Sequence, residues 1–125
     1  MGYFEEKIAK EIVDIAYKIH QNLGPGLLES VYERCFTESL RVRGIAFKRQ
    51  VEVDIEFEGI NIERALRIDL LIENCIIVEL KAQTEYKTVW EAQLLSYMKL
   101  TRVKLGFIIN FHVPLIKHGI KRRVL

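Results

Sequence analysis

The sequence is poor in cysteine, proline and glycine, and each scarcity excludes a class of protein. Its 125 residues include only two cysteines, two prolines and seven glycines. Two thiols are too few for a disulfide scaffold or a four-thiolate metal site, and so little glycine and proline excludes collagen-like and low-complexity chains. No apolar run approaches the roughly 18–20 residues of a membrane span, and the acidic first residues lack the features of a signal peptide. We therefore expect a cytoplasmic protein with reduced thiols and no membrane contact.

The apolar content and the charge give weaker indications. Half of the residues are apolar, which is enough for a substantial core, and we expect one domain over residues 1–125. The net charge is only +2, so overall charge alone does not indicate nucleic acid. Two short basic clusters occur, at residues 41–49 and at the C-terminal end, which includes Lys121, Arg122 and Arg123. Each could contact nucleic-acid phosphates or form a solvated surface, and the sequence leaves both interpretations open.

Hydrophobic periodicity predicts helices first and then mostly strands. The expected helices span residues 4–21, 27–43 and 88–100. The expected strands span residues 51–57, 64–72, 76–82, 105–110 and 120–125. This order, ααβββαβ(β), predicts an α/β or α+β fold with a mixed central sheet flanked by helices.

The second and third expected strands form a hairpin whose register can be derived. Alternate residues of each strand are apolar, and both apolar sets must face one core, which leaves one class of register. It pairs Ile72 with Ile76, Leu70 with Val78 and Ile68 with Leu80, around a three-residue loop. On the other face Asp69 then lies directly opposite Glu79. Like charges that face each other directly across two strands destabilise a sheet.

The opposed carboxylates of Asp69 and Glu79 suggest a metal site. A divalent cation ligated by both would remove the conflict, and hard oxygen ligands without a thiolate point to Mg²⁺ or Mn²⁺. Lys81 lies on the same face, where its ammonium could hold a water or a phosphate oxygen, or stabilise a developing negative charge. The alternative is an exposed strand face on which Arg67 and Lys81 offset the two acids. The hairpin alone leaves both interpretations open.

The spacing of these charged residues resembles a known signature. Asp69, nine intervening residues and Glu79-Leu80-Lys81 resemble the D-x(n)-(D/E)-x-K motif of the PD-(D/E)xK nuclease superfamily. Ile68 replaces the proline of the formal motif. The resemblance implies a restriction-endonuclease-like core.

Two further segments extend the resemblance to residues 12–125. Gln93 and Tyr97 share one side of the expected third helix and resemble the Q-x-x-x-Y motif of the RecB-like and lambda-exonuclease-like branch. Residues 26–32, with Gly26, Glu29 and Tyr32, match the pattern of the small GxxExxY proteins assigned to the same superfamily.

The resemblance implies roles for individual residues. Asp69 and Glu79 would ligate the metal, with the Leu80 carbonyl as an additional ligand, and Lys81 would orient or activate the attacking water. Glu29 would supply a further ligand or contact a metal-bound water; alternatively it is a favourable acid in the first turn of a helix.

The remaining candidates are less specific. Gln93 would steady the lysine or contact DNA, or it is an ordinary residue at the margin of a buried face. Tyr97 would contact nucleic acid, although a tyrosine at this spacing is more often part of the core. His20 resembles an upstream histidine ligand of some RecB-like nucleases, or it interacts with a helix dipole. Trp90 is expected to pack between helix and sheet, although an exposed aromatic there could stack on a base.

Two functions from different classes follow. The first is a Mg²⁺- or Mn²⁺-dependent nuclease that hydrolyses phosphodiester bonds of DNA, or of RNA, with a metal-activated water. The second is a catalytically silent module that binds nucleic acid or a partner protein. A homodimer is compatible with either.

Overall fold

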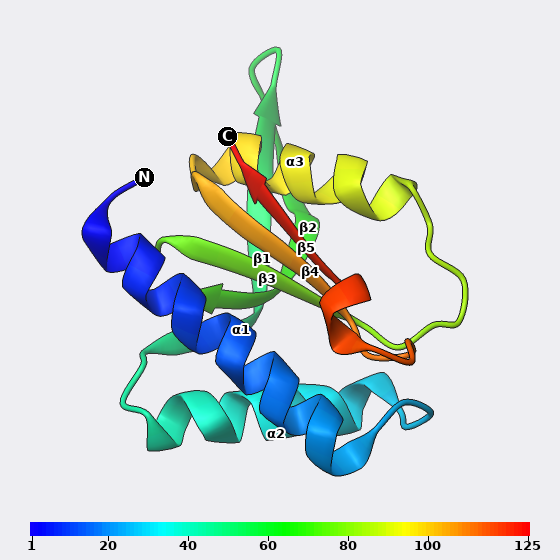
Figure 1. Cartoon of the computed structure of the whole chain (residues 1–125). Helices are drawn as coiled ribbons and strands as arrows, with labels where there is room; N and C mark the ends of the chain where they lie inside the picture. Colours follow the sequence, from blue (N-terminus) through cyan, green and yellow to red (C-terminus); the bar gives the residue numbers. More distant parts are fainter.

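The computed structural model describes residues 1–125, which form three α-helices, a short 3₁₀ helix and a five-stranded sheet (Figure 1). The helices are α1 (Tyr3–Leu23), α2 (Glu29–Val42), α3 (Val89–Thr101) and the 3₁₀ helix η1 (Ile116–His118). The strands are β1 (Phe47–Phe57), β2 (Ile60–Ile72), β3 (Ile76–Lys81), β4 (Leu105–Asn110) and β5 (Ile120–Val124). They pair in chain order, and β3 and β4 are parallel while the other pairs are antiparallel. The predicted mixed sheet with flanking helices is confirmed.

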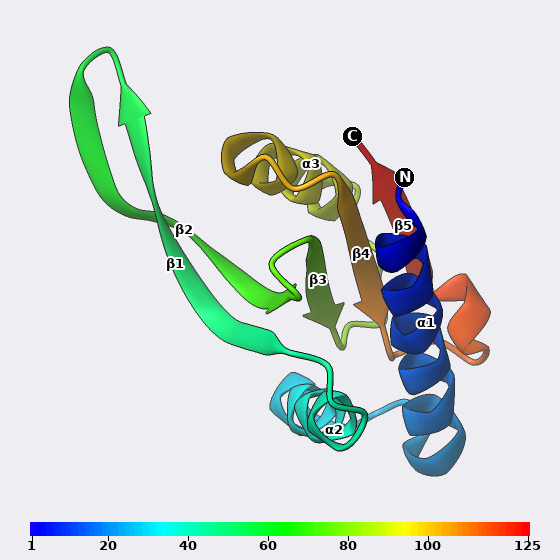
Figure 2. The ribbon, with the colours of Figure 1, turned by 90° about the vertical axis from the view of Figure 1, so that its left-hand side faces the viewer.

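The central strands of the sheet, β3 and β4, are covered on both faces. Neighbouring residues of a strand point to opposite faces, and the two buried clusters follow this rule. Ile76 and Val78 pack with residues of α1 and α2, whereas Ile77 packs with residues of α3. In Figure 2, α3 accordingly lies on the other side of β3 and β4 from α1. None of the helices combines the length and the apolar character that a bilayer crossing requires.

The strands β1 and β2 extend beyond the rest of the sheet as a two-stranded ribbon, residues 51–68, which we call the β1–β2 arm (Figure 2). Its turn, Glu58-Gly59, has positive φ at both residues, as a type I′ hairpin turn requires. Both strands are longer than predicted: β2 begins at Ile60 rather than at residue 64, because it pairs with β1 up to the turn, and β1 begins at Phe47 rather than at residue 51. Close to the turn, Ile60 and Ile62 are exposed.

The derived hairpin register is correct near its loop and wrong farther away. Leu70 pairs with Val78 and Ile72 with Ile76, but the β2–β3 ladder ends there. Ile68 does not oppose Leu80: it packs with the cluster under α3, while Leu80 packs with the cluster under α1 and α2. The reason is that β2 leaves β3 after Leu70 and continues with β1 alone.

Candidate active site

Asp69 on β2 and Glu79 on β3 meet at the point where the β2–β3 ladder ends. The backbone N–H of Asp69 donates to Glu79 Oε2 at 2.8 Å, and the N–H of Leu80 donates to Asp69 Oδ2 at 3.0 Å. The two carboxylates thus replace ladder hydrogen bonds and hold the diverging strands together. The predicted proximity is present, although side chains rather than backbone pairing create it.

Burial perturbs both of these carboxyl groups. Glu79 is only 4% exposed, and this burial, followed by the charge of Asp69, raises the pKa of Glu79 to about 8. Burial also raises the pKa of Asp69, although the Leu80 N–H and the Lys81 ammonium act in the opposite direction. The pair therefore retains a proton at neutral pH until a positive charge displaces it.

One oxygen of each carboxylate remains available. The bonds to backbone use Glu79 Oε2 and Asp69 Oδ2, which leaves Oε1 and Oδ1 without a donor from the protein. Neither oxygen is buried without a partner; Gln50 Oε1 is the side-chain atom in that state.

The donor set limits how an ion could bind here. No group of three or more His, Cys, Asp or Glu side chains is gathered closely enough to hold an ion. Mg²⁺ is commonly bound by one or two carboxylates, with waters and substrate phosphates completing the shell. Two free carboxylate oxygens fit such a cation, provided that solvent supplies most of the coordination.

Lys81 brings a positive charge to these carboxylates. It follows Glu79 on the same face of β3, and its charge lowers the pKa of Glu79, of Asp69 and of Glu29. Its Nζ lies 5.4 Å from the centre of the Trp90 ring, within the range of a cation–π contact. Trp90 itself is buried between α3 and the sheet, as predicted.

Glu29 approaches the pair from the first residue of α2. Although it is exposed, partial desolvation and then the charge of Asp69 raise its pKa. The loop before it is fixed by Tyr32, whose hydroxyl donates to the Gly24 carbonyl at 2.6 Å and accepts from the Leu27 N–H at 3.1 Å. The tyrosine of the 26–32 pattern therefore fixes the loop that contains Gly26 and precedes Glu29.

The Gln93 and Tyr97 pair lies on α3, on the side that faces the carboxylates. Tyr97 is half-buried, and its pKa is raised by burial, then by the charges of Glu79 and Asp69; a contact with the Gln93 side chain lowers it. Tyr97 thus packs against the core cluster of α3 and is influenced by the charges of both carboxylates, while its contact with nucleic acid stays a prediction.

Gln50 is a residue that sequence reasoning missed. Arg49 pairs with Leu70 and Val51 with Ile68, so Gln50 falls opposite Asp69 in the β1–β2 register. It has a positive φ of 52° within β1, and its Nε2 donates to Glu33 Oε1 at 2.7 Å. Its own Oε1 is left buried without a donor. Nothing in the local sequence indicates this, because glutamine is an ordinary residue in a half-exposed strand.

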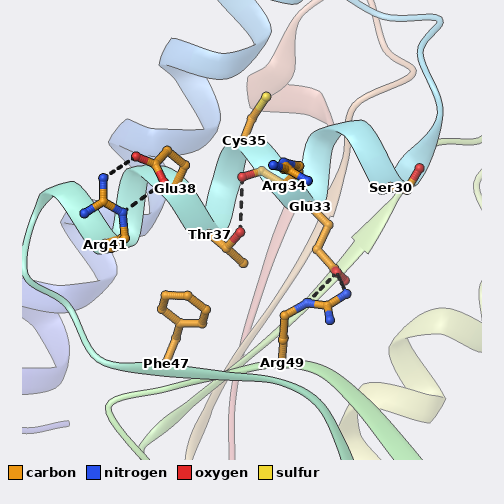
Figure 3. Close-up of a pocket in the computed structure, with 9 residues that line it drawn as sticks. All are labelled: Ser30, Glu33, Arg34, Cys35, Thr37, Glu38, Arg41, Phe47 and Arg49. Atoms are coloured by element: carbon orange, nitrogen blue, oxygen red, sulfur yellow. Dashed lines mark hydrogen bonds and ion pairs between the residues drawn. The ribbon is translucent and has the colours of Figure 1, made fainter.

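A cavity of about 980 Å³ lies beside α2 and the start of β1, but the carboxylate pair does not line it (Figure 3). Its lining residues are Ser30, Glu33, Arg34, Cys35, Thr37, Glu38, Arg41, Phe47 and Arg49. Two of its arginines are already paired, Arg49 with Glu33 and Arg41 with Glu38, as Figure 3 shows. This pairing reduces the positive charge available to a phosphate.

The C-terminal basic residues do not form one surface. Lys121 lies with its Nζ 5.6 Å from the centre of the Tyr86 ring. Arg123 pairs with Glu91 of α3, whereas Arg122 pairs with Glu6 of α1. Alternation along β5 thus divides the predicted phosphate-binding group between the two faces of the sheet, and two of its three members already have acidic partners.

His20 lies in the last turn of α1. Its Nε2 is 2.8 Å from the Val113 carbonyl oxygen in the loop after β4. The structure therefore gives this imidazole a partner in the protein, and it belongs to no cluster of ligands. We do not include it in the proposed site.

Comparison with known proteins agrees with this geometry. The family model of the PD-(D/E)XK nuclease superfamily matches residues 6–123. No curated protein and no solved structure matches the chain. Because the match covers nearly the whole sequence, the chain belongs to the PD-(D/E)XK nuclease superfamily.

Proposed function

We propose that this protein is a Mg²⁺- or Mn²⁺-dependent nuclease that hydrolyses phosphodiester bonds of DNA. The observation that carries the proposal is the pair of free carboxylate oxygens on Asp69 and Glu79, next to the ammonium of Lys81. Membership of a nuclease superfamily supports the same conclusion.

Each site residue has a role that its position supports. Asp69, Glu79 and the Leu80 carbonyl would hold the cation, which when bound activates a water and neutralises charge on the phosphate. Lys81 orients the attacking water and stabilises the charge that develops on phosphate oxygens. Glu29 contacts water at the cation, and Gln93 and Tyr97 border the strand to be cut.

The finer assignments are part of the same proposal. The fixed loop before Glu29 supports the GxxExxY group, and the adjacency of Gln93 and Tyr97 supports the RecB-like branch. RNA as substrate, a homodimer and a single domain in the cytoplasm remain predictions; sedimentation of the purified protein would measure the oligomeric state.

The test is hydrolysis of linear and circular DNA with Mg²⁺ or Mn²⁺ by the wild-type protein and Lys81→Ala. Removing the ammonium should lower the rate by roughly 10²- to 10⁴-fold, as for other positioned groups that act in proton transfer. Lys99→Ala, at an exposed position of α3, is the matched control and should leave the rate unchanged. Equal rates for the wild type and Lys81→Ala on every substrate would contradict the proposal.

A silent binding module is the second candidate, and the absence of a three-ligand cluster favours it. Calorimetric titration with Mn²⁺ separates the two functions. A nuclease should bind the ion with heat that disappears in Asp69→Asn, whereas a silent module should bind no ion at this pair.

A further inference from the structure

The loop between β3 and α3 presents an aromatic ring close to Lys81. Tyr86 is 39% exposed, and its ring lies 5.3 Å from that of Trp90 at an interplanar angle of 77°. Trp90 in turn lies under the Lys81 ammonium. A single ring therefore separates Tyr86 from the lysine of the proposed active site.

The Tyr86 ring is held in place rather than free to rotate into the protein. Its hydroxyl donates to Glu91, and Glu91 also pairs with Arg123 of β5. The edge-to-face contact with Trp90 supports the ring from a second direction. This leaves a preorganised aromatic surface whose exposed part faces solvent.

Lys121 provides a positive charge at the same place. An exposed cation–π contact such as that between its Nζ and the Tyr86 ring is weak, whereas stacking of a nucleic-acid base on an aromatic side chain is stronger. The ammonium can therefore leave the ring for a phosphate when a base takes its position.

We propose that Tyr86 stacks on an unpaired base of the nucleic-acid strand held at Lys81, and that Lys121 contacts a phosphate of the same strand. This inference rests on the proposed function for its ligand, a nucleic acid. It also restricts the substrate class: a base inside a duplex cannot offer its face to the ring, so the ligand is a single strand or an unpaired end.

The experiment measures binding without cleavage. Fluorescein-labelled oligothymidine octamer and an abasic octamer of equal length are titrated with protein in excess EDTA, and anisotropy gives the dissociation constants. The wild type should bind oligothymidine more tightly than the abasic strand. Tyr86→Ala should weaken oligothymidine binding by about five- to 150-fold and leave abasic binding within about twofold.

Four further variants separate stacking from structure and from charge. Tyr86→Phe loses the bond to Glu91 but keeps the ring and its contact with Trp90, and should keep most of the affinity. Tyr86→Leu keeps apolar packing on Trp90 and should behave like Tyr86→Ala. Tyr3→Ala, at a tyrosine exposed on α1, should bind like the wild type. Lys121→Gln should weaken both strands equally.

Several outcomes would overturn the inference: no binding of either strand, equal binding of both strands by the wild type, equal weakening of both by Tyr86→Ala, or preferential binding of duplex. Failure of the nuclease proposal would look different. In that case Asp69→Asn would leave hydrolysis unchanged or hydrolysis would be absent, while the oligothymidine affinity and its dependence on Tyr86 would persist.

Discussion

The junction of β2 with β3 and the β1–β2 arm each contain an aspartate that accepts a backbone N–H from the opposite segment. In the arm, Asp54 Oδ1 accepts from the Arg64 N–H at 2.9 Å, where the β1–β2 register shifts. At the junction, Asp69 Oδ2 accepts from Leu80. Asp54 is exposed and has an amide, Asn61, as its nearest side-chain partner, whereas Asp69 is half-buried among other acids and a lysine.

This difference shows what makes a carboxylate chemically useful. In the arm, Asp54 accepts a backbone N–H where the strand pairing is irregular. It does so without a second buried carboxylate beside it, so this role is structural. Only the junction adds a second buried carboxylate, Glu79, and an ammonium, Lys81. Burial and charge, rather than the hydrogen bond to backbone, distinguish the candidate site from a strand irregularity.

The two aspartates should differ most in their effect on catalysis, which the same substitution at both positions tests. Asp69→Asn should reduce DNA hydrolysis by about 10²- to 10⁴-fold, because it removes a proposed metal ligand while keeping an acceptor for the Leu80 N–H. Asp54→Asn should change the rate by less than about twofold. The measurement is the initial rate in Mn²⁺. Similar losses in both variants would show that Asp69 acts only by accepting a backbone N–H.

Packing should differ between the two regions as well. Ile68 is fully buried although it lies just beyond the β2–β3 ladder, whereas Ile62, farther along the arm, is 42% exposed. Ile68→Ala should reduce the free energy of unfolding by about 2–5 kcal/mol, and Ile62→Ala by less than about 0.5 kcal/mol. Urea denaturation measures both, and a large loss for Ile62→Ala would mean that the arm is packed against something in solution.

The protonation of Glu79 gives an effect on stability with a definite sign. An unfolded glutamate loses its proton near its ordinary pKa of 4.5, but folded Glu79 keeps it up to a pKa of about 8. Without metal, the folded state therefore binds more protons between these values, and stability should fall by about 1.4 kcal/mol per pH unit as pH rises through this window.

Glu79→Gln should remove most of that slope, measured by urea denaturation in EDTA from pH 5 to pH 8. Glu63→Gln, at an exposed position of the arm, is the matched control and should keep the wild-type slope. A wild-type stability that is independent of pH across this window would contradict the buried, protonated carboxyl.

The smallest effect concerns the loop that presents Glu29, the third acid near the junction. Tyr32→Phe removes the hydroxyl that bonds Gly24 and Leu27 just before α2 and should reduce the free energy of unfolding by about 0.5–1.5 kcal/mol. Tyr17→Phe, at an exposed tyrosine of α1, should be neutral. Equal stabilities of the two variants would mean that the hydroxyl does not fix the loop.

Much of the fold could be predicted because most elements have one buried face. The stripe Ile8, Ile12, Ile15 and Ile19 predicts α1, and the apolar residues nearest the hairpin loop predict the β2–β3 pairing. The prediction for Ile68 failed because alternation gives the face of a residue but not the point at which a strand leaves its neighbour.

Some residues of the candidate site could likewise be predicted from the sequence, and others could not. Asp69, Glu79 and Lys81 could be found because they lie within one hairpin, where register relates them. Gln50 could not, since its place opposite Asp69 depends on pairing with a separate strand and on a positive φ. Tyr86 had a weak signal, an aromatic residue in a polar loop directly after β3, which sequence reasoning passed over.

The order of these residues along the chain has a consequence for partial unfolding. Asp69, Glu79, Lys81, Gln93 and Tyr97 belong to consecutive elements, whereas Glu29 reaches them from α2, on the far side of β1 in the sequence. Segments open locally with free energies below that of global unfolding. Fraying of the first turn of α2 would withdraw Glu29 while the other groups stayed assembled. Hydrogen exchange of the backbone amides in that turn would therefore measure how often Glu29 leaves the site.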